Sequence, residues 1–178
     1  MVPEAGHPER DKQAIEQAWK VHAAQVDWTG KVDTKASFAF TIESATLGIT
    51  VALSATNRIF ASMPSGLPPF LYWAGIVALL CGMFCALMCV IPRLKSKDLL
   101  KTAEENFIYF GHARHWDPDR LVDAFKEHDM LPMITRQIVV MADVAWDKHK
   151  WVQRSMALGV VAGVCLGISG MMLSSVHH

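Results

Sequence analysis

The sequence predicts an all-α integral membrane protein with three transmembrane helices and a small helical cytoplasmic region. Hydrophobic residues make up 52% of the 178 residues and charged residues only 19%, whereas an average soluble domain carries about 25% charged residues. The uncharged residues gather in three stretches of membrane-spanning length. If these stretches cross a membrane, almost all basic residues lie on the same side of it. Since seventeen basic residues balance seventeen acidic ones, the composition excludes a nucleic-acid binder that relies on net positive charge, an ordinary soluble enzyme and a disordered chain.

The three predicted spans cover residues 36–57, 70–91 and 156–176. Only Glu43 interrupts the first span, and the other two contain no charged residue. At a rise of about 1.5 Å per residue, a helix of about twenty residues crosses the hydrocarbon core of about 30 Å. We therefore expect a transmembrane hairpin over residues 36–91, and a third transmembrane helix with a short outer tail over residues 156–178.

The basic residues predict the orientation of the chain. Five of them lie in residues 1–35 and eleven in residues 92–155, whereas the loop between the first two spans carries only Arg58. Because cytoplasmic loops carry an excess of Lys and Arg, the N-terminus should be cytoplasmic and the C-terminus should lie outside.

The cytoplasmic segments read as helices. An amphipathic helix is expected over residues 9–27, within an N-terminal segment (residues 1–35) that leads into the membrane. A second cytoplasmic helix is expected over residues 99–110. A third should begin at Pro118, with Asp117 as its N-cap.

The last stretch before the C-terminus contains no helix-breaking proline. Residues 133–176 are therefore expected to form one helix of about forty-four residues, roughly 66 Å long, that runs from the cytoplasm through the bilayer. The cytoplasmic part of this helix belongs to the small helical cytoplasmic region, which is expected to cover residues 92–155.

The first span carries a stripe of small and polar residues at heptad spacing, with Glu43, Thr46 and Thr50 at its centre. One interpretation is that this stripe packs on partner helices, as is common in membrane bundles. The other is that it lines a water path when several copies assemble. An ionisable group inside a span is costly and usually functional. Protonation, a hydrogen bond to Thr46 or Ser44, or a later membrane boundary would also explain Glu43.

Two further patterns on the spans indicate packing. Glycines follow one another at spacings of four and three on the third span, namely Gly159, Gly163, Gly167 and Gly170. Such small-residue faces allow close helix approach, within a subunit or between subunits. Three cysteines four residues apart on the second span are read in the same way. No metal-binding, cofactor-binding or catalytic residue set can be assembled, so the protein is not expected to be an enzyme.

Basic residues cluster where the spans meet the cytoplasm. Their default explanation is topology and contact with anionic lipid. They could also hold an anionic ligand near the membrane.

Three stretches together resemble a known family. They are residues 28–36, with Trp28, Asp33, Lys35 and Ala36; residues 105–112, with an N-x-x-Y-F-G motif from Asn106 to Gly111; and residues 142–150. This combination resembles the transmembrane effector family of Pycsar antiphage defence systems over most of the chain. One departure is Val32, where the family is expected to favour alanine.

The resemblance implies a multi-pass protein of the bacterial inner membrane that is encoded beside a pyrimidine cyclase. In such systems infection triggers synthesis of cyclic CMP or cyclic UMP, the effector senses it, and membrane integrity is lost, so that growth stops or the cell dies. The expected partners are thus a cyclic pyrimidine mononucleotide, the lipid bilayer, the cyclase as a functional partner, and further copies of the chain as a homo-oligomer.

A ligand of this kind needs a cation for its phosphate, an aromatic ring for its base and polar groups for the base edge. The phosphate candidates are Lys35, Lys148 and Lys150, the stacking candidates Trp28, Tyr109 and Trp146, and the polar candidates Asp33, Asn106 and Asp143. Glu43, Thr46 and Thr50 are the candidates for the membrane output. The main alternative is a constitutive membrane anchor that recruits a soluble partner through residues 92–155; a related effector that answers cyclic oligonucleotides would differ only in its ligand.

Overall fold

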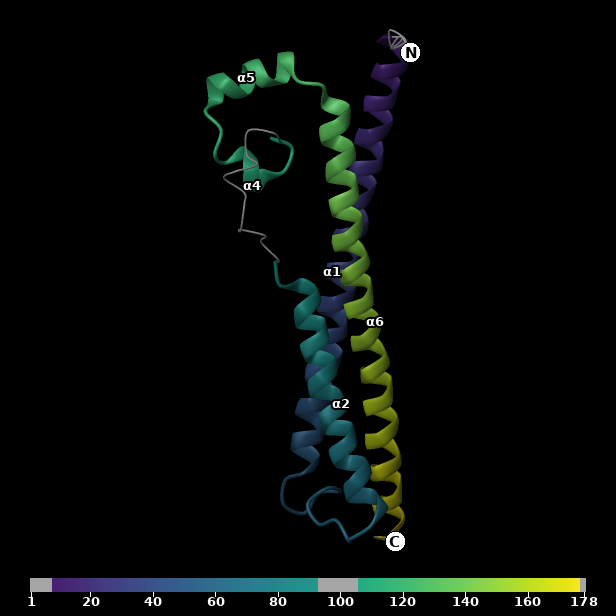
Figure 1. Ribbon diagram of the computed structural model, residues 1–178. Coiled ribbons are helices and arrows are strands. Elements are labelled where there is room, and N and C mark those ends of the chain that lie inside the picture. Colours follow the sequence, from purple (N-terminus) through teal and green to yellow (C-terminus); the bar gives the residue numbers. More distant parts are fainter. Residues whose placement is uncertain (1–7, 93–105, 177–178) are drawn as a thin grey trace. The chain divides into compact units, whose positions relative to one another are not determined.

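The computed structural model describes residues 8–92 and 106–176, and within them every regular element is a helix. The helices are α1 (Pro8–Leu53), α2 (Leu67–Val90), α4 (Phe110–Ala113), α5 (Pro118–Glu127) and α6 (Met130–Val176) (Figure 1). Contacts divide the chain into two compact units. Unit 1 comprises Met1–Thr29 and Pro92–Trp146, and unit 2 comprises Gly30–Ile91 and Asp147–His178.

The predicted amphipathic helix and the first span form one uninterrupted helix, α1, of 46 residues. It ends at Leu53, four residues before the expected end of the first span. Beyond that point Asn57 adopts a left-handed conformation with a φ of 63°, which Asn tolerates better than most residues. The Phe60 amide then donates to the Leu53 carbonyl at 3.0 Å, so the chain turns back immediately after α1.

The expectation of one long C-terminal helix is confirmed by α6, which has 47 residues. It begins at Met130, earlier than expected, because Asp129 accepts a hydrogen bond from the Leu131 amide at 3.0 Å. Pro132 lies in the first turn, where the missing N–H group costs nothing. The Asp117 cap of α5 is also confirmed, since its carboxylate accepts from the Asp119 and Arg120 amides.

The expected helix over residues 99–110 differs from the structure. Residues 99–105 lie outside the described residues, and residues 106–109 are not helical. The Asn106 side chain accepts a hydrogen bond from the Ile108 amide at 3.0 Å, and such a turn competes with a helix. The helix α4 begins only at Phe110.

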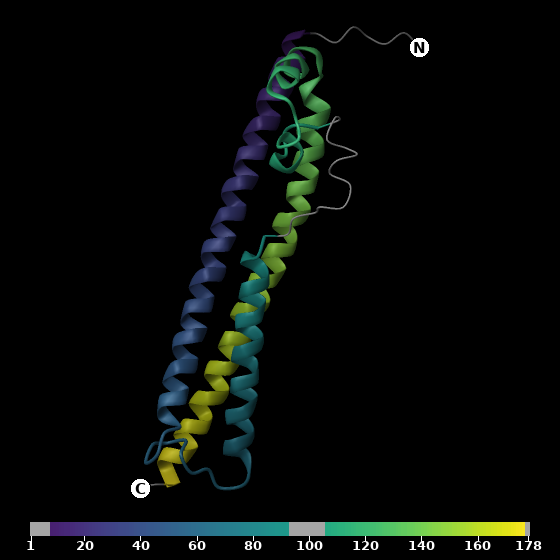
Figure 2. The same ribbon diagram turned by 90° about the vertical axis from the view of Figure 1, so that its left-hand side faces the viewer.

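Unit 2 is a three-helix bundle in which α2 runs alongside residues 30–53 of α1 and residues 147–176 of α6 (Figures 1 and 2). Its inward residues alternate at spacings of three and four, the heptad pattern of coiled coils. On α2 the buried residues of this pattern are Tyr72, Gly75, Leu79, Gly82, Ala86 and Cys89, with Ala78 and Cys85 buried beside them. On α6 the buried residues of this pattern are Val152, Ser155, Ala162, Leu166, Ser169 and Leu173.

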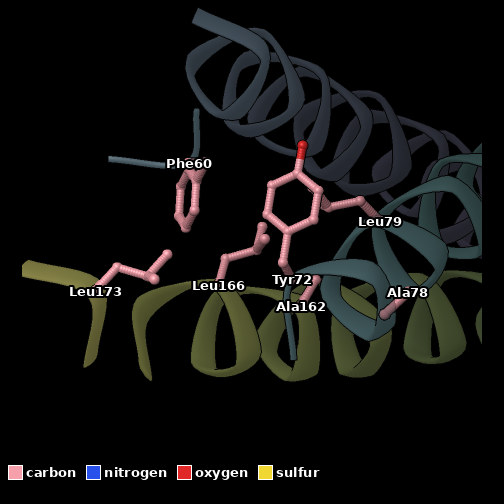
Figure 3. Close-up of a cluster of buried hydrophobic side chains, with 7 residues drawn as sticks. All are labelled: Phe60, Tyr72, Ala78, Leu79, Ala162, Leu166 and Leu173. Atoms are coloured by element: carbon pink, nitrogen blue, oxygen red, sulfur yellow. The ribbon is translucent and has the colours of Figure 1, made fainter. Parts of the chain in front are cut away.

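One end of the bundle is closed by an apolar cluster around Tyr72 and Leu166 (Figure 3). The rings of Phe60 and Tyr72 lie 5.0 Å apart, and the Tyr72 hydroxyl, which points toward α1 in Figure 3, lies 2.9 Å from Ser54 Oγ. Ser169 donates to the carbonyl of Pro68 at 2.8 Å. The first two contacts fix the hairpin loop onto α2, and the third joins α2 to α6.

Unit 1 contains α4, α5 and residues 130–146 of α6, with residues 8–29 of α1. Its core contains Phe107, Ala124 and Met133. Phe107 contacts the rings of Trp116 and Phe125, at centroid distances of 5.7 and 4.6 Å. The segment that carries the N-x-x-Y-F-G motif is therefore packed into a small helical core.

Three helices, α1, α2 and α6, contain stretches long and apolar enough to cross a membrane. Large apolar side chains on their outer faces are exposed, among them Phe38, Phe84 and Val160, as expected of surfaces that contact lipid. The prediction of an all-α membrane protein with three spans is confirmed.

Candidate functional site

Glu43 is buried in the centre of the three-helix bundle. Its side chain lies on α1, and only 3% of the residue is exposed. Ser155 of α6, which is completely buried, donates its hydroxyl to Glu43 Oε1 at 3.0 Å. The predicted partners, Thr46 and Ser44, instead donate to backbone carbonyls of α1. The hydrogen bond of Glu43 therefore joins two helices and not two turns of one helix.

Two glycines make room for this carboxyl group. A Cβ atom on Gly82 of α2 would lie 2.7 Å from Glu43 Oε1, and one on Gly159 of α6 would lie 3.1 Å from it. The first distance is shorter than any ordinary contact, so both helices approach the acid through positions without a side chain. Glu43 Oε2 is buried and has no hydrogen-bond partner among the described residues. The three helices thus meet in one layer around a single polar group.

The polar stripe of the first span faces this interior. Thr50 is 4% exposed, and its hydroxyl donates to the Thr46 carbonyl at 2.8 Å. By contrast, Phe38 and Ile49 on the other faces of α1 are more than 60% exposed. Within the chain the stripe therefore packs against α2 and α6, which agrees with the packing interpretation.

Of the glycines on the third span, only some make close contacts within the chain. Gly159 contacts Glu43, and a Cβ atom on Gly170 would lie 3.5 Å from the Phe60 ring. Cβ atoms on Gly163 and Gly167 would meet nothing within 4 Å. The row of glycines on α6 therefore divides into positions that face the bundle, Gly159 and Gly170, and positions that face outward, Gly163 and Gly167.

Asp33 and Lys148 form an ion pair between α1 and α6. Lys148 Nζ donates to both carboxylate oxygens, at 2.6 and 2.7 Å. Beside them lies a buried cluster of Val32, Ala36, Cys89 and Val152. This pair is the contact that brings together two of the predicted ligand residues.

The other predicted ligand residues are divided between the units. In unit 2, Lys35 and Lys150 are exposed. In unit 1, Trp28 and Asp143 are exposed on α1 and α6, Asn106 is buried, and Tyr109 is partly buried at the start of α4. Asn106 uses its side-chain oxygen to hold the turn before α4, so its role within the chain is structural.

His112 directly follows the N-x-x-Y-F-G motif and was not among the predicted ligand residues. Its ring contacts Tyr109, with centroids 5.5 Å apart. Burial, together with the positive charges of Arg136 and His115, lowers the pKa of His112 below its ordinary value. The signal in the sequence was the spacing of His112 and His115, but nothing in it placed Arg136 nearby.

The glycine layer generates a first prediction. Gly82→Ala should lower the free energy of unfolding by about 1–3 kcal/mol, because the added methyl group displaces a confined carboxyl group from Ser155. The measurement is thermal or denaturant unfolding of the purified protein in detergent.

Gly163→Ala is the matched control, since its Cβ atom meets nothing within 4 Å, and its effect should stay within about 0.5 kcal/mol. In a double-mutant cycle, Glu43→Ala should remove most of the cost of Gly82→Ala. Equal effects of the two glycine substitutions would contradict the layer.

His112 generates a second prediction. Because folding lowers its pKa, the unfolded chain binds more protons than the folded one between the two pKa values. The stability that His112 contributes is thus present above its unfolded pKa of about 6.5 and is lost as the pH falls through the lower folded value. The melting temperature of His112→Gln should therefore depend less on pH between about 7 and 5 than that of the wild type. His149→Gln, in unit 2, serves as control; identical pH profiles for wild type and His112→Gln would refute the assignment.

Comparison with known proteins identifies the family. The sequence profile described as the Pycsar effector protein domain matches residues 17–174. The chain is also 25% identical to the Pycsar effector protein PtPycTM of Propioniciclava tarda over 164 residues, which cover 88% of this chain and 78% of that protein. No solved structure matches the chain. Because the profile covers most of the sequence, including the three resembling stretches, the first two spans and most of the third, the chain belongs to the Pycsar effector protein domain family.

Proposed function

We propose that the protein is a membrane effector of bacterial antiphage defence and that it is gated by cyclic CMP or cyclic UMP. In this function it impairs the inner membrane and stops growth. The observation that carries this proposal is the family match over residues 17–174. That region contains every candidate ligand residue and the apolar stretches of α1, α2 and α6. The protein acts by binding and rearrangement, without catalysing a reaction on its ligand.

The chemistry of the candidate residues supports a small anionic ligand. Lys35, Lys148 and Lys150 lie within unit 2 and can neutralise a phosphate. In unit 1 Tyr109 already contacts another ring, that of His112, and a base could stack on such a surface.

The proposed location is the inner membrane, with the N-terminus in the cytoplasm. This orientation rests on the excess of Lys and Arg in residues 1–35 and 92–155. It puts the cationic residues on the side where a nucleotide second messenger is made.

The membrane output is proposed to involve Glu43, Thr46 and Thr50. In the packed bundle Glu43 and Thr50 are shielded from lipid. If the helices separate, these polar groups must meet water or another copy of the chain, because exposure to lipid is costly. Separation of the bundle therefore favours a hydrated or oligomeric state, which would let ions pass.

The proposal predicts that cyclic CMP or cyclic UMP binds the purified protein and raises its melting temperature. A ligand that binds only the folded state stabilises it by about 2.7 kcal/mol at one hundred times its Kd. Lys35→Ala and Tyr109→Ala should abolish this stabilisation and the growth arrest, while membrane levels of the protein stay normal. Binding is measured by calorimetry, with cyclic AMP as the comparison ligand.

Arg58→Ala is the matched control, since Arg58 is the only basic residue of the loop between α1 and α2 and should leave binding intact. Inside-out membrane vesicles should leak when the nucleotide is added, and right-side-out vesicles should not. If the wild type binds neither pyrimidine nucleotide and growth arrest needs none, the protein is a constitutive anchor that recruits a partner through residues 92–155.

A further inference from the structure

The ion pair between Asp33 and Lys148 joins two helices through residues that are 115 positions apart in the sequence. Both carboxylate oxygens accept from the same ammonium group, at 2.6 and 2.7 Å. The side chains of Lys148 and Asp33 are 17% and 35% exposed, so water screens this pair less than an ordinary surface pair. At this level of the bundle, an ion pair therefore adds to the apolar contact between α1 and α6.

Lys148 also contacts the third helix of the bundle. The Cys89 thiol at the end of α2 donates to the Lys148 carbonyl at 3.5 Å, and Cys89 is completely buried. One residue of α6 thus binds α1 through its side chain and α2 through its backbone. A movement of α6 at Lys148 would therefore alter its contacts with both α1 and α2.

The carboxylate of Asp33 is chemically similar to the anion that the proposed ligand carries. An ammonium group binds carboxylate and phosphate oxygens through the same charge-assisted hydrogen bonds. Lys35 and Lys150 lie within two residues of the pair in the sequence, and both are exposed. A phosphate that approaches these lysines would find Lys148 already bound to Asp33.

We propose, on the basis of the function proposed above, that Asp33 occupies on Lys148 the place that the ligand's phosphate takes. The Asp33–Lys148 pair is then an autoinhibitory contact that a cyclic nucleotide breaks. When the phosphate binds Lys148, Asp33 loses its partner beside the apolar cluster of Val32 and Ala36, and α1 separates from α6 at that level. This changes the role of Asp33 from reading the base edge to competing with the ligand.

Such a contact satisfies the requirement for gating. A ligand shifts an equilibrium only by the difference between its affinities for the two states. In the closed state Asp33 blocks Lys148, whereas in the open state Lys148 is available to the phosphate. The difference in affinity therefore arises from the same pair that holds the helices together.

The test compares variants of the full-length protein in dye-loaded proteoliposomes and in calorimetry with cyclic CMP and cyclic UMP. Asp33→Asn keeps the shape and removes the charge, so dye should leak without nucleotide, and the affinity for the nucleotide should rise about tenfold. Lys148→Met should leak in the same way but bind no nucleotide. The exchanged pair, Asp33→Lys with Lys148→Asp, should restore the closed state and remain without nucleotide binding.

Asp123→Asn is the matched control, because it breaks an ion pair with Lys126 that is exposed and lies within one helix, and it should behave as the wild type. Wild-type affinity and wild-type leak in Asp33→Asn would overturn the inference, as would a leak in the exchanged pair equal to that of the single variants. If the wild type binds neither nucleotide, the proposed function fails. The leak of Asp33→Asn and its reversal in the exchanged pair would still decide whether the contact closes the bundle.

Discussion

The carboxyl group of Glu43, held between two glycines, is the contact on which the arrangement of the three spans depends. It needs a position without a side chain on each neighbouring helix, Gly82 and Gly159, and a donor, Ser155. These requirements fix the rotation of α1 and its register against α2 and α6. Along each helix, the other inward positions lie at alternating spacings of three and four residues. The small and polar stripe of α1 is thereby turned away from lipid.

Polar and small residues hold a membrane bundle together because lipid offers little hydrophobic driving force for helix association. Here two such contacts lie at different levels of unit 2. Glu43 and Ser155 are buried beneath the surface of the bundle, whereas Asp33 and Lys148 remain partly accessible. In the gating mechanism proposed above, the accessible pair is the one that an anion from solution reaches, and burial of Glu43 disfavours a partly opened bundle. A bundle built in this way is well suited to switch between a closed and an open arrangement.

Sequence patterns were sufficient for the three spans, the single long helix α6 and the N-cap at Asp117, because these depend on local composition and spacing. They also identified the small and polar stripe around Glu43, but left open whether it packs on neighbouring helices or lines a water path. They did not predict that Ser155 is the partner of Glu43 or that Asp33 pairs with Lys148, since each pair is separated by more than 110 residues. The expected helix around Asn106 was partly wrong because one side-chain hydrogen bond favours a turn there. The change from an amphipathic to an apolar composition suggested two elements over residues 8–53, although nothing between them ends a helix.

The most direct test of this account is cysteine cross-linking in native membranes between Ala36→Cys and the native Cys89, with the other cysteines replaced. Both positions are completely buried in one cluster of α1, α2 and α6. The account predicts that mild oxidation joins α1 to α2 within one chain, and that Phe38→Cys, which is 68% exposed, forms no such link. A link between different chains at Ala36→Cys, or an intramolecular link at Phe38→Cys, would show that the stripe of Glu43 faces away from its own bundle and would contradict the account.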